Sequence, residues 1–135
     1  MTWSQSLIKL AGYEVEVLQK RLNEVVERRA AAEARLMALE TEGAMEAAFS
    51  SDDAAAGFYR LGYLEGLKAR KARAQVAIDE LLAEEQGARD ALAEAFESQK
   101  KYEQVAETAM ILERKQAGRR ETAAFDEMAL RKVAR

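Results

Sequence analysis

The side chains closest to an acid–base arrangement are Lys100, Lys101 and Tyr102, which follow one another in a long charged stretch. Tyr102 falls at a seam position of a helical pattern and the lysines flank it, so we interpret them as packing and surface residues. The chain has no Cys and no His. This excludes a thiol nucleophile, a Cys/His zinc site and an imidazole base. We therefore expect no enzyme activity and no cofactor. We also expect no metal bound by carboxylates alone, because acidic side chains on helices usually form a solvated face.

Charged residues gather in blocks that suit binding better than catalysis. Residues 60–73 carry five basic and one acidic side chain, residues 79–97 carry seven acidic and one basic, and residues 98–120 carry six basic and three acidic. A basic block can meet nucleic acid. The net charge of −3 and the neighbouring acidic block oppose that, so we expect no nucleic acid partner.

The composition predicts long helices in a single domain, 1–135. One third of the residues are charged, proline is absent, and aromatic residues make up 7%, a profile typical of coiled coils. No apolar run is long enough to span a membrane, and the opening "MTWSQSLIKLAGYE" lacks the apolar core and cleavage site of a signal peptide. We expect a cytoplasmic protein.

A first helix is predicted over about residues 4–48, since apolar residues recur at alternating steps of three and four, the repeat of a coiled-coil seam. Thr2 and Gln5 can form a capping box at its start. Only Arg29 and Gly43 interrupt the apolar character of the seam. Its members are Ile8, Ala11, Val15, Leu18, Leu22, Val25, Arg29, Ala32, Leu36, Leu39 and Gly43.

A tip over about residues 49–57 and a second helix over about residues 58–133 follow. Ser50 or Ser51 would cap this helix. Its seam is poorer, with Leu64, Leu67, Lys71, Ala74, Ile78, Leu81, Glu85, Ala88, Leu92, Ala95, Gln99 and Tyr102. A short connection makes neighbouring helices antiparallel, so we predict an all-α antiparallel coiled-coil hairpin.

The register of that hairpin, meaning the alignment of one helix along the other, decides whether Arg29 and Glu85 lie close enough to pair. In one register of the seam, Arg29 meets Leu81 and lies one layer from Glu85, which would let the two charges fix the register. The alternative is that both side chains extend outward to water. The sequence leaves the two interpretations open.

The two helices differ in length, and the second overhangs the first. The first runs out near residue 5, so its partner runs out near residues 100–105. Roughly 30 residues remain, about 45 Å of helix, and an isolated helix of that length is marginal in water. We therefore predict that the overhang docks on another molecule. The aromatic cluster at the tip fits either tip packing or partner contact; its members are Phe49, Phe58, Tyr59 and Tyr63.

From residue 91 onward the sequence resembles the flagellar type III export stalk family, FliJ, of the alphaproteobacterial kind. The likeness lies in "LAEAF", in "KKYE" (Lys100–Glu103), in "ERK" (Glu113–Lys115) and in "FDEMALRK" (Phe125–Lys132). The family commonly ends in Leu-Asp-Glu-x-Ala-x-Arg-Arg. This chain has Phe for Leu and Lys for the second Arg, which preserves the character of both positions.

The resemblance implies a stalk whose paired termini enter the pore of a hexameric flagellar export ATPase, while the tip meets the cytoplasmic part of the membrane export gate. It implies a free monomer, peripheral at the inner face of the cell membrane, that promotes ATPase assembly and export, with export chaperones as further partners. The ATPase-binding residues would be Lys100, Lys101, Arg114, Arg119, Arg120, Arg131 and Lys132. The gate-binding residues would be Leu39, Met45, Phe49, Phe58 and Leu64.

Two other functions fit the same pattern. A homodimeric coiled-coil scaffold would pair two chains without any ATPase. An export chaperone would bind a client helix along an exposed apolar groove.

Overall fold

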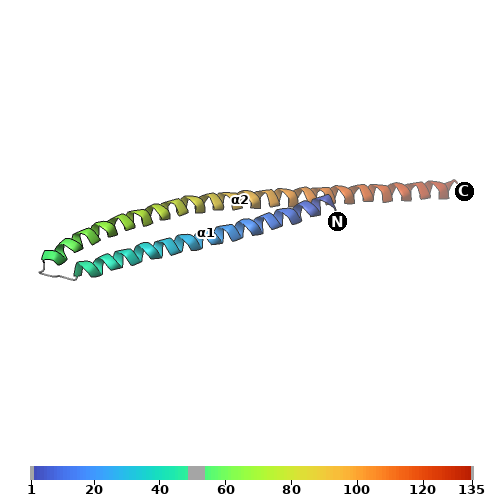
Figure 1. Ribbon diagram of the computed structural model, residues 1–135. Coiled ribbons are helices and arrows are strands. Elements are labelled where there is room, and N and C mark those ends of the chain that lie inside the picture. Colours follow the sequence, from blue (N-terminus) through green and yellow to red (C-terminus); the bar gives the residue numbers. More distant parts are fainter. Residues whose placement is uncertain (1, 49–53, 135) are drawn as a thin grey trace. The chain divides into compact units, whose positions relative to one another are not determined.

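The computed structural model describes residues 2–48 and 54–134, almost all of them in two helices, α1 (Trp3–Ala48) and α2 (Ala54–Val133) (Figure 1). Its contacts divide the chain into two units, which we name the terminal unit (Met1–Val15 with Glu94–Arg135) and the hairpin unit (Glu16–Ala93). The predicted fold class, an all-α antiparallel hairpin with a longer second helix, is confirmed. α2 begins at Ala54 rather than near residue 58. The proposed caps Ser50 and Ser51 lie outside the described residues.

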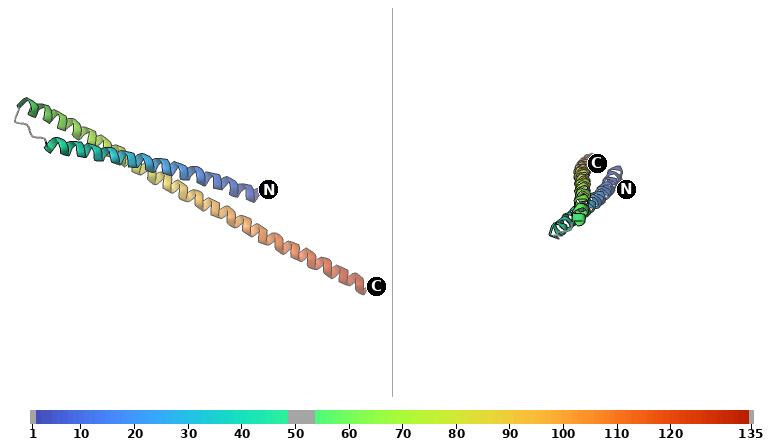
Figure 2. Two further views of the ribbon diagram at one scale, coloured as in Figure 1. Left: turned by 90° about the horizontal axis from the view of Figure 1, so that it is seen from below. Right: turned by 60° about the vertical axis from the view of Figure 1, so that its left-hand side comes forward.

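In the hairpin unit α1 and α2 run side by side in opposite directions, as Figure 1 and the left view of Figure 2 show. Every predicted seam position of this unit is buried or half-buried. Val25 is the most enclosed, at 1% exposed. The 3.5-residue repeat therefore identified the packed face of both helices.

Near the tip, a small core forms around Leu39, Leu67 and Ala74. Gly43 allows this packing, because a Cβ at that position would lie 2.9 Å from Leu67 Cδ2. That distance is too short for two carbon atoms in contact. A glycine in the seam thus lets a leucine of α2 pack directly against the backbone of α1.

A charged network crosses the middle of the seam. Arg29 Nη2 donates to Glu85 Oε1 at 3.2 Å, and Arg29 Nε lies 3.1 Å from Glu85 Oε2 as an ion-pair contact without hydrogen-bond alignment. Arg29 also donates to Glu33 at 2.9 Å, and Arg89 lies 3.4 Å from Glu85. The hydrogen bond to Glu85, followed by the one to Glu33, raises the pKa of Arg29.

This network settles the question of register. Arg29 contacts Glu85, and Gly43 packs on Leu67 at the offset that also pairs Arg29 with Leu81. The contacts therefore agree with the register in which Arg29 lies one layer from Glu85. Glu85 is only 7% exposed, which also excludes the interpretation that both charges extend into water. A buried carboxylate needs a charged partner, and Arg29 from the opposite helix supplies one to Glu85.

The C-terminal end of α1 is capped from the opposite helix. Arg60 Nη2 donates to the backbone carbonyls of Glu46 at 2.9 Å and Ala47 at 3.0 Å. The last turn of α1 contains no basic residue of its own. Arg60 therefore satisfies carbonyls that lack helical partners and places a cation at the negative end of the helix dipole.

The terminal unit holds the start of α1. Thr2 N–H donates to Gln5 Oε1 at 3.1 Å, and Gln5 N–H donates to Thr2 Oγ1 at 3.3 Å, so the predicted capping box is present. Ala11 and Ala95 are buried. Tyr102, expected in the seam, is 37% exposed and marks where the packing opens. Neither helix, over the residues described, has a stretch apolar and long enough to cross a membrane.

Candidate functional site

The strongest candidate for a binding site is the exposed end of α2, residues 105–133, which we name the arm. Every described side chain from residue 107 to residue 134 is exposed. The arm is supported by local contacts within its own helix. Thr122 Oγ1 donates to the Gly118 carbonyl at 2.9 Å, and Arg131 pairs with Glu127 at 3.0 Å. Such contacts contribute a few tenths of a kcal/mol each, too little to hold a helix of this length.

The seven basic residues predicted to bind an ATPase all lie on exposed helix of the terminal unit. Lys101 pairs with Glu97 at 3.8 Å and Arg131 with Glu127 at 3.0 Å, both at solvent-exposed positions. The other five have no ion pair to any residue that the structure describes. They are Lys100, Arg114, Arg119, Arg120 and Lys132. Their charges are therefore available to a partner.

Large apolar side chains flank the basic part of the arm on both sides. Their exposed fractions range from 46% for Ile111 to 85% for Val133. The full set is Val105, Met110, Ile111, Leu112, Phe125, Met128, Leu130 and Val133.

The apolar residues of the arm do not form a single stripe. Met110, Ile111 and Leu112 are consecutive, and each residue turns the helix by about 100°. These three alone therefore point in three directions. One partner helix would cover one stripe only, so the arm is suited to a partner that surrounds it.

Near its end the arm combines apolar and basic groups around one shallow hollow. Phe125, Met128 and Ala129 line it together with Arg131 and Lys132, and its volume is about 520 Å³. An apolar floor with cations at the rim fits a partner surface that carries both apolar and acidic side chains. This is the segment in which "FDEMALRK" lies.

The five residues predicted to bind an export gate differ in their exposure to solvent. Leu39 is buried at 8% exposed, and Leu64 packs against the same core. Met45 and Phe58 are exposed, at 71% and 75%. Phe49 lies outside the described residues.

Two further exposed residues extend the surface of the tip. Tyr59 is 77% exposed and Leu61 is 66% exposed. The rings of Phe58 and Tyr59 meet edge to face with centroids 6.3 Å apart. Tyr63, in contrast, packs on the core. The aromatic cluster thus divides into a packed part and an exposed part, which the sequence could not distinguish.

Tyr63 also links the two helices through its hydroxyl, which donates to Glu42 Oε1. The guanidinium of Arg70 lies over its ring, 5.7 Å from the centroid. The hydrogen bond to Glu42 is the main cause that raises the pKa of Tyr63, and desolvation adds to it.

We predict that this hydrogen bond makes the stability of the hairpin unit depend on alkaline pH. Since the folded-state pKa of Tyr63 is raised, its contribution is fully present below the ordinary tyrosine pKa of about 10. The contribution is lost as pH rises through the higher folded-state pKa. Urea unfolding across this range should show a fall in stability for the wild type that Tyr63→Phe lacks. Tyr59→Phe should keep the fall, and an identical curve for Tyr63→Phe would contradict the prediction.

The fold and the site together define a class, a coiled-coil hairpin protein with an exposed, cation-bearing helical arm. Comparison with known proteins then identifies the family. The family model described as Flagellar FliJ protein matches residues 5–135. The chain is 50% identical over 132 residues to the Flagellar FliJ protein of Caulobacter vibrioides strain NA1000 / CB15N, covering 98% of this chain and 95% of that protein.

The same figures hold for the Flagellar FliJ protein of Caulobacter vibrioides strain ATCC 19089 / CIP 103742 / CB 15. No solved structure matches the chain. The chain belongs to the flagellar FliJ family, and the resemblance noted in the sequence is confirmed. As a member of that family, it is a component of the flagellar protein-export apparatus.

Proposed function

We propose that this chain is the stalk of the export apparatus. The arm docks in the pore of the hexameric flagellar export ATPase, and the tip contacts the cytoplasmic part of the membrane export gate. Docking promotes assembly and activity of the ATPase and couples it to export. The protein is a monomer when free and works at the inner face of the cell membrane.

The observation that supports this role most strongly is the distribution of exposed side chains around the arm. Apolar groups of the arm point in several directions, and five of its cations lack carboxylate partners among the described residues. These are Arg114, Lys115, Arg119, Arg120 and Lys132. A long isolated helix is marginal in water, so the arm gains most from a partner that encloses it. The interior of a ring-shaped hexamer provides such an enclosure.

Electrostatics gives the docking its specificity. The segment 114–132 carries six basic and three acidic side chains. An ion pair at 4 Å is worth roughly 1–4 kcal/mol, depending on the local dielectric. A few such pairs to acidic residues of the ring would favour one rotational setting of the arm over others.

The tip has a different chemistry, which suits a different partner. Its exposed surface is apolar and aromatic, with Met45, Phe58, Tyr59 and Leu61. Exposed aromatic clusters of this kind commonly supply the energy of protein–protein contacts. We assign this surface to the export gate, with Leu39 and Leu64 supporting it from the core.

The test is a pulldown from extract of flagellated cells with the full chain as bait, together with light scattering of the purified protein. We expect recovery of the export ATPase and a monomer mass. A dimer mass without ATPase would replace the stalk with a coiled-coil scaffold. Recovery of a filament subunit without ATPase would replace it with an export chaperone.

A further inference from the structure

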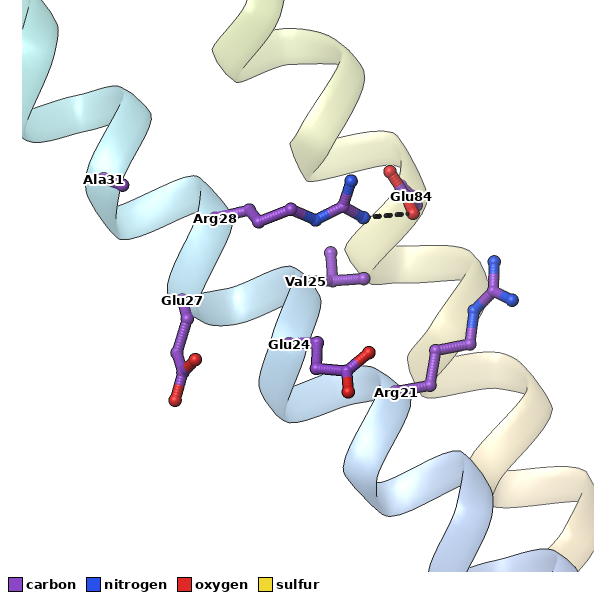
Figure 3. A pocket seen from close by; sticks show the side chains of 7 residues that line it. All are labelled: Arg21, Glu24, Val25, Glu27, Arg28, Ala31 and Glu84. Atoms are coloured by element: carbon purple, nitrogen blue, oxygen red, sulfur yellow. Dashed lines mark hydrogen bonds and ion pairs between the residues drawn. The ribbon is translucent and has the colours of Figure 1, made fainter.

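Two hollows lie between α1 and α2 in the hairpin unit, and their charges differ. The first is about 600 Å³ and is lined by both signs of charge. Figure 3 shows Arg28 reaching across to Glu84 beside Val25, with Glu24 nearby and Glu27 pointing away from α2. Arg28 Nη2 lies 2.6 Å from Glu84 Oε1. The lining of this hollow is neutralised by its own residues.

The second hollow is about 380 Å³, and all its charged lining residues are arginines. Arg35 comes from α1, and Arg70 and Arg73 come from α2. The remaining lining residues are Ala32, Ala74 and Ala77. None of the three arginines has an ion pair within the part of the chain that the structure describes. Three arginine side chains therefore line one open space.

The sequence provides no acid that could neutralise these arginines along their own helices. Side chains three and four residues apart are the neighbours on a helix surface. For Arg35 these are Ala31, Ala32, Ala38 and Leu39; for Arg70, Gly66, Leu67, Arg73 and Ala74; for Arg73, Ala69, Arg70, Val76 and Ala77. Every neighbour is apolar or another arginine.

Positive charge on both sides of a helix pair opposes the pairing. Elsewhere the same two helices use opposite charges, as in Arg28 with Glu84 and Arg29 with Glu85. At the second hollow arginines from α1 and α2 meet instead. The like charges cost stability in the free protein unless an anion lies between them.

Two features prepare this hollow for an anion. Arg70 is held over the ring of Tyr63, which in turn donates to Glu42, so one guanidinium is positioned in advance. The alanine walls leave the space between the arginines open. Arginine presents a planar fork of donors that matches the oxygens of a phosphate group.

We infer that Arg35, Arg70 and Arg73 form a binding site for a phosphate group, carried by a soluble phosphorylated anion or by the headgroup of an anionic lipid. The site lies on the flank of the hairpin unit, on neither the arm nor the exposed tip. It is therefore independent of the contacts proposed for the stalk. Occupancy would relieve the repulsion between the helices and so stabilise the hairpin unit.

The test measures binding of two probes to the full chain at physiological ionic strength. Inorganic pyrophosphate is titrated by calorimetry, and vesicles of phosphatidylcholine with phosphatidylglycerol are tested by cosedimentation. The double variant Arg35→Gln/Arg73→Gln should weaken binding at least about tenfold. The matched control Lys20→Gln/Arg21→Gln removes the same charge from exposed positions of the same unit and should keep wild-type binding.

A further variant separates the arginine fork from net charge. Arg35→Lys/Arg73→Lys keeps the charge but loses the planar donors, and it should bind more weakly than the wild type. Pyrophosphate binding assigns the site to a soluble anion, and binding of vesicles alone assigns it to a lipid headgroup. The inference is overturned if the wild type binds neither probe. Equal losses in both glutamine variants, or no loss in Arg35→Gln/Arg73→Gln, would also overturn it.

Discussion

Reversal of four arm charges, with glutamate at positions 119, 120, 131 and 132, should abolish stimulation of the export ATPase. Arg119, Arg120 and Lys132 have no carboxylate partner among the described residues, and Arg131 pairs only with Glu127 on the surface. Four attractions to an acidic ring would become four repulsions, each worth roughly 1–4 kcal/mol. Helicity by circular dichroism should persist apart from the last turn, where acidic residues oppose the helix dipole.

The control is reversal of four exposed cations outside the arm, Lys9, Lys20, Arg21 and Lys68. This variant has the same net charge, so loss of stimulation in both would indicate a nonspecific effect. Full stimulation by the arm variant would show that these cations do not touch the ATPase.

Glu85→Ala should produce the largest loss of stability of any single substitution in the charged network. Glu85 is 7% exposed and contacts both Arg29 and Arg89. Removing one partner of a buried ion pair leaves the other uncompensated, so we expect a loss of about 3 kcal/mol in the free energy of unfolding. Urea unfolding followed by circular dichroism measures it.

Glu84→Ala is the matched control, because Glu84 is the adjacent acid and also pairs across the helices. Its pair with Arg28 is open to water, so the expected loss is below about 1 kcal/mol. The double variant Arg29→Leu/Glu85→Leu should recover stability, since well-packed apolar residues can replace a buried pair. Equal losses for Glu84→Ala and Glu85→Ala would contradict the role given to the buried pair.

The sequence was sufficient to predict the fold because the hairpin depends on a periodic pattern. Steps of three and four place seam residues on one face irrespective of their exact partners. This is why Leu22, Val25, Leu67 and Ile78 were predicted correctly as core. The alignment of the two helices was not predictable in the same way, because a heptad pattern matches itself at several offsets.

Contacts between residues far apart in the sequence could not be predicted from local patterns. Arg60 caps α1 from the other helix, and no local pattern marks it. Leu39 was predicted as a seam residue and, through the family resemblance, as a gate-binding residue; its burial beside Leu67 confirms the seam position. The exposure of the basic residues of the arm was predictable, because it follows from the unequal lengths of the helices.

The exposed arm is tested most directly by hydrogen exchange of the full chain, alone and with the export ATPase. In the free protein, amides of residues 107–133 should exchange much faster than those around Val25 and Ile78, because no part of the chain that the structure describes packs on the arm. With the ATPase, protection should appear along the arm and leave the seam of the hairpin unit unchanged. An arm already protected in the free monomer, or one that gains no protection in the complex, would contradict the account.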